Sequence, residues 1–132
     1  MPILSNILAL PLVTVSFVTG TNEDWLDAIV YFVADAEGNQ SDQQLDIRGI
    51  SFEMEIRRAA PDHEVILHAT TEDGTIAFGF PPDVGYLLIN VSHESMATRE
   101  PGQYVGDIVA RDAGFVRRVI EFDIDILEGI TR

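Results

Sequence analysis

Apolar and polar residues alternate with a period of two along most of the chain. In the segment 50–58, ISFEMEIRR, four large apolar side chains share one face and the side chains between them are polar or charged. Successive side chains of a β-strand point to opposite faces, so this period is typical of a strand buried on one side. The further segments with this alternation are 12–19, 25–34, 64–70, 86–92, 103–111 and 119–127.

The segment 25–34, WLDAIVYFVA, is less regular than the others because both phases of its alternation contain apolar residues. We expect its other phase to be partly covered as well, so that this strand is buried on both sides. The phase predicted to face the core consists of Leu26, Ala28, Val30 and Phe32.

Three carboxylates occupy alternate positions in the segment 119–127, VIEFDIDIL. Acids in a row along one strand diverge, whereas calcium requires six or more oxygens that converge on one point. The pattern therefore favours a solvated strand face over a metal site or a pair of catalytic carboxylates. The predicted core phase is Val116, Ile120, Phe122, Ile124 and Ile126, and the predicted outer phase is Arg117, Val119, Glu121, Asp123 and Asp125.

Turn signals separate these segments at short intervals. They are DAEGN (35–39), EDG (72–74), PPDVG (81–85) and RDAG (111–114). The polar segment 92–102 predicts a loop that crosses between sheets. About seven or eight short strands predict an all-β fold, in which two antiparallel sheets pack face to face. We assign this sandwich to residues 12–132, and we expect residues 1–11 to form an N-terminal arm or an extra edge strand.

The first eleven residues, MPILSNILALP, are markedly apolar. They are too short and too interrupted by proline to span a membrane as a helix. A large exposed apolar surface usually marks an interaction site, so we expect this arm to contact a neighbouring subunit. Trp25, at the start of a predicted strand, is a weaker candidate for the same role. The predicted interface residues are Ile3, Leu4, Ile7, Leu8 and Trp25.

The charge balance excludes several classes of partner. The chain contains 22 acidic residues against 8 Lys and Arg, for a net charge of −14, and it has no cysteine. A phosphate backbone and an anionic membrane both attract basic surfaces, so we predict that the chain binds neither nucleic acid nor membrane. Disulfides and thiolate metal sites are ruled out. The acidic excess serves solubility or meets a basic neighbour.

The residue types that carry out catalysis show no recognisable spacing. His63, His68 and His93 lack the spacing of metal ligands, and each lies in a turn, in a loop or on the polar phase of a strand. The glycine-rich motifs that bind nucleotides and the G-x-S-x-G nucleophile motif do not occur in the sequence. We therefore predict a non-enzymatic protein with no cofactor and no metal.

Two longer segments contain a recognisable order of motifs. In the first, DIRGISFEMEIRRAAPD, a short turn leads into a strand that ends in I-R-R. Its matching residues are Asp46, Gly49, Ile50, Ile56, Arg57 and Arg58. In the second, residues 101–132, the matching residues are Pro101, Gly102, Tyr104, Asp107, Gly114, Thr131 and Arg132. This order resembles bacteriophage tail and baseplate proteins, in particular the N-terminal β-sandwich domain of baseplate upper proteins and small prophage-encoded relatives.

The resemblance implies an immunoglobulin-like β-sandwich that acts as a structural subunit of a virion and has no catalytic residues. It implies synthesis in the bacterial cytoplasm and assembly with other virion proteins and with copies of the same chain, as a homo-oligomer. Two alternatives stay open. One is a decoration protein of the phage head, and the other is a carbohydrate- or calcium-binding module supported only by the acids and Trp25.

Overall fold

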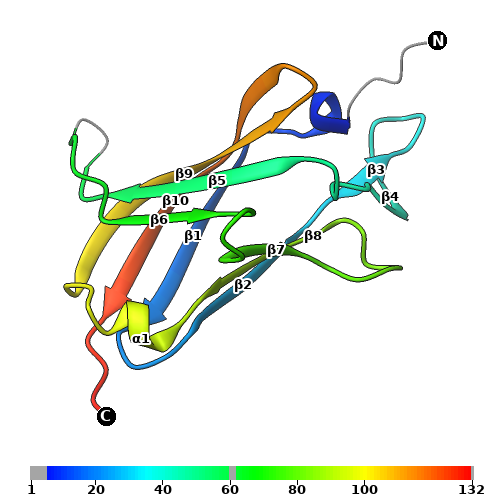
Figure 1. The fold of residues 1–132 in the computed structure, drawn as a ribbon. Helices are drawn as coiled ribbons and strands as arrows, with labels where there is room; N and C mark the ends of the chain where they lie inside the picture. Colours follow the sequence, from blue (N-terminus) through cyan, green and yellow to red (C-terminus); the bar gives the residue numbers. More distant parts are fainter. Residues whose placement is uncertain (1–5, 60–61, 132) are drawn as a thin grey trace.

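The computed structural model describes residues 6–59 and 62–131, and most of its strands form two packed sheets (Figure 1). The larger sheet has five strands in the order β1-β10-β9-β5-β6, the smaller has three in the order β2-β8-β7, and β3 pairs only with β4. The predicted all-β sandwich is confirmed, with ten strands in the described residues instead of seven or eight. The strands are β1 (Val13–Gly20), β2 (Trp25–Val30), β3 (Phe32–Ala34), β4 (Gln40–Gln44), β5 (Ser51–Arg57), β6 (Leu67–Thr70), β7 (Ile76–Phe78), β8 (Tyr86–Val91), β9 (Gly102–Asp112) and β10 (Phe115–Leu127).

The hairpin of β9 and β10 forms the centre of the larger sheet. Its two-residue loop, Ala113 and Gly114, has φ angles of 51° and 82°. Positive φ at both central positions gives the turn a twist that matches the twist of the two strands. Glycine adopts this conformation freely, which explains its place in the predicted RDAG turn. On its other side β10 pairs with β1, and this pairing is parallel whereas the other strand pairs are antiparallel.

A bulge interrupts β10 between Arg118 and Ile120 and changes its alternation. The predicted core phase from Ile120 to Ile126 is confirmed, because its four side chains are all buried. Before the bulge the prediction is wrong: Val116 is exposed and Val119 is buried. An extra residue in one strand shifts every earlier side chain to the opposite face, and a strict period of two cannot anticipate that shift.

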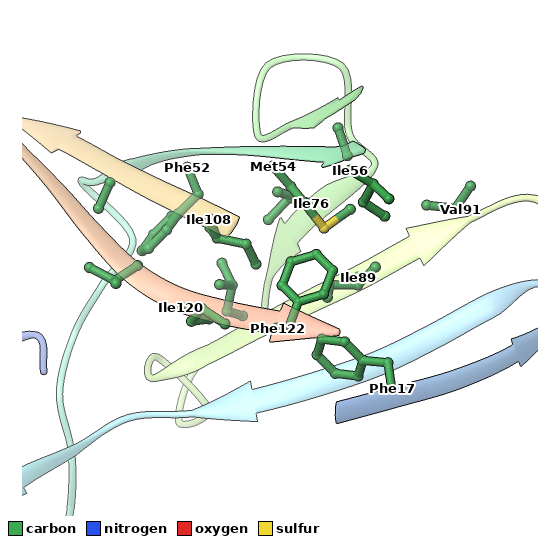
Figure 2. Close-up of a cluster of buried hydrophobic side chains, with 14 of the residues drawn as sticks. Phe17, Phe52, Met54, Ile56, Ile76, Ile89, Val91, Ile108, Ile120 and Phe122 are labelled. Atoms are coloured by element: carbon green, nitrogen blue, oxygen red, sulfur yellow. The ribbon is translucent and has the colours of Figure 1, made fainter. Parts of the chain in front are cut away.

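An aromatic cluster joins the two sheets where β1, β2 and β10 meet. The ring centroids of Phe17 and Phe122 are 5.3 Å apart, and those of Phe17 and Trp25 are 5.6 Å apart, both in edge-to-face geometry. Figure 2 shows Phe17 and Phe122 within the wider core. Gly106 lies opposite Phe122 in the sheet, and a Cβ atom there would sit 2.5 Å from the Phe122 ring. The ring therefore occupies the space that a side chain on β9 would need.

The predicted core phase of the segment 25–34 is wrong. Leu26 is 63% exposed, whereas Trp25 and Tyr31 are almost completely buried. The chain leaves the smaller sheet at Tyr31, whose backbone N–H donates to Gly85 and whose carbonyl accepts from Leu45. The segment therefore forms two strands with different partners, and the large Trp25 ring decides which phase of the first one enters the core.

The N-terminal segment packs into the sandwich. Residues Asn6–Ala9 form a single 3-10 turn, η1, and the side chains of Ile7 and Leu10 are fully buried in the core. The Asn6 side chain donates to the Asp46 carbonyl, 2.9 Å away, which ties the turn to the loop before β5. Residues 6–10 are thus neither a free arm nor an edge strand, and the core extends past the boundary expected at residue 11.

The predicted crossing loop between residues 92 and 102 is confirmed. It connects β8 in the smaller sheet to β9 in the larger one, and it contains one helical turn, α1 (His93–Met96), whose Met96 side chain is buried. The Ser92 side chain accepts from the Ser95 N–H and caps this turn. In the described part of the chain, no helix is long and apolar enough to cross a membrane.

Candidate interaction surface

The outer face of the larger sheet contains three carboxylates on three neighbouring strands. Glu55 of β5 lies directly opposite Asp107 of β9, which in turn lies opposite Glu121 of β10. Neighbouring strands are about 4.8 Å apart, so these groups form a row across the sheet, perpendicular to the acid row within β10. Arg57 and Arg118 line the same shallow depression as the three carboxylates.

The central carboxylate of this row has a perturbed pKa. Partial burial is the main cause that raises the pKa of Asp107 above its ordinary value of 3.8, and the negative charges of Glu55 and Glu121 add to it. Arg118 and Arg57 act in the opposite direction. A raised pKa in a carboxylate is a mark of some catalytic sites, but it also follows from crowding of like charges on a structural surface. Here the row lies on an open sheet face.

A metal site does not arise from this row or from any other described residues. Within residues 6–59 and 62–131, no group of three or more His, Cys, Asp or Glu side chains is arranged to hold a metal ion. Side chains on neighbouring strands of a flat sheet project in parallel, so their oxygens do not converge on one point.

The three histidines are exposed, as predicted, and two of them have acidic partners. His68 lies 2.6 Å from Glu53, and His93 lies 2.9 Å from Asp24. The Glu53 carboxylate also accepts a hydrogen bond from Arg111. The hydrogen bond with His68 is the largest cause that lowers the pKa of Glu53, and the one from Arg111 is the next largest. These pairs link neighbouring strands or loops on the surface, where each contributes little to stability.

The structure changes the predicted interface. Ile7 and Trp25 are buried by the chain's own atoms, at 0% and 1% exposure, so neither is available to a partner. Both belong to the core because their large apolar side chains close gaps in it. Leu8 is 43% exposed, so its role in an interface stays a prediction. Ile3 and Leu4 lie outside the described residues.

Trp25 is also unsuited to stacking on a sugar. Its ring is enclosed between the sheets, and its Nε1–H donates to the Asp27 carboxylate at 2.7 Å. Trp25 therefore does not support the alternative of a carbohydrate-binding module.

Seven of the ten exposed large apolar side chains of the described residues lie at the two ends of the β1–β10 pair. At one end, Val18, Leu127 and Ile130 line a shallow depression and are 63%, 55% and 96% exposed. At the other end, the Arg117 side chain donates to the Leu8 carbonyl, 3.3 Å away, and joins η1 to the β9–β10 hairpin. The exposed apolar residues there are Leu8, Leu12, Phe115 and Val116.

Apart from Leu8, the residues of these two apolar groups were missed at the sequence level, although a signal existed. Val18 follows Thr14 and Ser16 in the outer phase of β1, and Leu127 follows three acidic residues in the outer phase of β10 after the bulge. A large apolar residue in an outward phase is a candidate contact, because exposed apolar surface favours burial against a partner. Only the pairing of β1 with β10 brings the two positions together.

Comparison with known proteins adds no relative: no protein-family model matches the chain, and no curated protein matches it significantly.

Proposed function

We propose that the chain is a non-enzymatic structural subunit of a bacteriophage particle, located in the tail, baseplate or neck. It acts through packing against other virion proteins and against copies of itself. The proposal combines the resemblance of two sequence segments with the way those segments are used in the fold.

The two segments that carry the resemblance lie side by side in the larger sheet. β5 lies within the first segment and pairs with β9, which lies at the start of the second. The Arg58 guanidinium lies over the Tyr104 ring, 5.4 Å from its centroid, and also forms an ion pair with Glu100. The Tyr104 hydroxyl donates to the Glu100 carbonyl. Two of the matching residues, Arg58 and Tyr104, therefore contact one another at the larger sheet, which suits a structural module.

The strand order supports the immunoglobulin-like part of the proposal. The order β10-β9-β5-β6 in one sheet and β2-β8-β7 in the other corresponds to strands G-F-C-C′ and B-E-D of immunoglobulin domains. In those domains a tyrosine at the start of strand F donates a hydrogen bond to the backbone a few residues upstream. Tyr104 occupies this position and makes this bond to Glu100. The β3–β4 hairpin is an additional element between β2 and β5, which correspond to strands B and C.

The observation that carries the proposal is the position of the exposed apolar side chains. Of the ten exposed large apolar side chains among the described residues, seven lie at the two ends of the β1–β10 pair, whereas Leu26, Val65 and Phe80 lie elsewhere. Within the subunit these side chains gain nothing from exposure, whereas burial of apolar surface against a neighbour contributes about 25 cal/mol per Å². Such surfaces on a small sandwich suit a protein that is built into a larger assembly.

The proposal is tested by looking for the chain in particles. An antibody raised against the purified protein is applied to phage particles that were induced from a bacterium encoding it and banded by density. We expect the chain in the banded particles by mass spectrometry, in multiple copies per particle, with gold label at the tail or baseplate.

Label confined to the head would move the protein to the alternative role of head decoration. Absence of the chain from banded particles, at a detection limit below one copy per particle, would contradict a virion role.

A further inference from the structure

β1 is a free edge of the larger sheet, and it carries no charge. It pairs with β10 on one side, and no described strand pairs with its other side. Its eight residues, VTVSFVTG, contain neither a charged residue nor a proline. The first charged side chain of the sequence is Glu23, so all 22 acids and all 8 Lys and Arg follow this strand.

The other sheet edges formed by described residues are shorter or charged. β6 has four residues and presents His68, paired with Glu53. β7 has three residues, and β2 contains Asp27. Proteins keep free edges from pairing by making them short or by placing charges, prolines or bulges on them. β1 is eight residues long and carries no charge, proline or bulge.

The accessible part of this edge extends from Leu12 to Val18. Beyond it, the Thr19 hydroxyl lies 3.5 Å from the Glu23 carboxylate, and a Cβ atom at Gly20 would sit 3.1 Å from the Asn22 side chain. The loop after β1 therefore covers the end of the strand. Before that point Val13 and Val15 are only half-buried although they belong to the core phase, so the edge leaves apolar area uncovered on both faces.

We propose that a second copy of this chain pairs with β1, antiparallel and across a two-fold axis, to form one continuous ten-stranded sheet. Two copies with a charge of −14 each repel one another through their acidic faces. The uncharged edge is the approach at which strand pairing proceeds with the least repulsion. A two-fold axis brings the same strand of each copy together, so one surface is complementary to itself.

The alternation of side chains restricts the register. Residues directly opposite in an antiparallel pair point to the same face of the sheet. The two-fold axis must therefore place one residue of β1 directly opposite the same residue of the second copy. The pairing that uses only the accessible stretch is centred on Val15. It places Leu12, which is 50% exposed, opposite Val18 of the second copy, which is 63% exposed. Symmetry repeats this contact, so the two exposed apolar side chains at either end of each edge cover one another.

This inference rests on the proposed function in one respect, the association of the chain with copies of itself, but it has a separate test. The mass of the full chain is measured by sedimentation velocity over a range of concentrations. The 14.6 kDa subunit is expected to form a species of twice that mass. Added salt is expected to strengthen the dimer, because it screens the repulsion between the two negative subunits.

Two substitutions locate the contact. Val18→Lys is expected to weaken the dimer at least tenfold, although it reduces the net negative charge, because it places an ammonium group opposite Leu12. The matched control His68→Lys puts the same group on the other edge of the sheet and is expected to leave the dimer unchanged. Circular dichroism checks that both variants keep the fold.

A cysteine at the axis gives a covalent readout. The natural chain has no cysteine, so Val15→Cys is expected to form a disulfide between two copies on mild oxidation, because directly opposite residues have Cβ atoms about 5 Å apart. His68→Cys is expected not to do so. A folded chain that stays monomeric at every concentration overturns the inference. This holds even if β1 is then found to bind an extended peptide. A dimer that is indifferent to Val18→Lys, with no Val15→Cys disulfide, overturns it as well.

The outcomes separate the two proposals. A monomeric chain that is present in particles contradicts the β1 contact and leaves the virion role. If the chain dimerises through β1 but is absent from particles, the β1 contact is supported and the virion role is contradicted.

Discussion

The two faces of the larger sheet belong to the same strands, but their side chains have different environments. On the inner face, Ile108 and Phe122 are almost completely buried and pack against the smaller sheet (Figure 2). On the outer face, their neighbours Asp107 and Glu121 form part of a row of carboxylates. The inner side chains are constrained by close packing, in which one missing methylene matters. The outer side chains are constrained only by solvent and by whatever the subunit meets.

The outer face itself divides into two regions. β5, β9 and β10 present carboxylates, whereas the adjacent strand β1 presents Thr14, Ser16 and Val18. The change from charged to uncharged occurs within one strand spacing, about 4.8 Å. A face that only needed solubility has no reason to lose its charge at the free edge, where charge is most useful against unwanted pairing. The division is what the proposed pairing of two copies through β1 would require.

The largest effect is expected from a pair of neighbouring residues on opposite faces. Phe122→Ala removes the centre of the aromatic cluster beside Gly106 and is expected to lower the free energy of unfolding by about 3–5 kcal/mol. Glu121→Ala, one residue earlier and on the outer face, is expected to change it by no more than about 0.5 kcal/mol. Urea denaturation of both variants measures the difference. Equal losses would show that the outer face is packed as tightly as the core.

Replacing each of two tyrosines by phenylalanine is expected to change the free energy of unfolding by a smaller amount, and in opposite directions. The Tyr104 hydroxyl donates to the Glu100 carbonyl, whereas the Tyr31 hydroxyl is buried and has no hydrogen-bond partner among residues 6–59 and 62–131. Tyr104→Phe is expected to destabilise by about 1 kcal/mol, and Tyr31→Phe to be neutral or stabilising by up to about 1 kcal/mol, because it removes an unsatisfied polar group. Thermal unfolding monitored by circular dichroism compares them. A loss of stability in Tyr31→Phe would mean that its hydroxyl has a partner.

The smallest effect concerns the centre of the carboxylate row. Because the pKa of Asp107 is raised in the folded chain, the folded state holds this proton more tightly than the unfolded state. The contribution of this group to stability is therefore zero at low pH and becomes unfavourable as pH rises through its folded pKa. Asp107→Asn is expected to stabilise the protein at pH 7 by a few tenths of a kcal/mol, about the size of solvent-screened interactions, and the gain is expected to vanish below pH 3 or so.

Denaturation curves of the wild type and Asp107→Asn at several pH values between about 3 and 7 test this sign. A stability difference that grows as pH falls would contradict the pKa shift. Asp123→Asn, on the same face of β10, is a matched control for the loss of one negative charge.

The sequence predicted the strands and their faces wherever one phase was clearly more apolar. The segments that became β5, β8 and the later part of β10 are examples, and their core side chains are all buried. The prediction failed at Leu26, where both phases were apolar, and at Val116, where a bulge shifts the phase. Both failures depend on contacts with residues far along the chain, to which a local pattern does not respond.

The candidate surface was only partly accessible to prediction. The apolar N-terminal segment was recognised, but Ile7 turned out to close the core and Leu8 to face outward. The row of Glu55, Asp107 and Glu121 was invisible, because its members are separated by more than fifty residues or by a hairpin in the sequence and meet only through strand pairing.

The sequence by itself determined the all-β architecture, the turn at Gly114 and the acid phase of β10, because alternation and backbone preference act between residues close together in the chain. The tertiary structure decided which strand lies at the edge, which carboxylates are neighbours, and which apolar side chains remain exposed. Those properties depend on the order of strands in a sheet, which is set by the packing of the whole core. The proposal that β1 is a contact site rests on this strand order, in which no described strand pairs with the other side of β1.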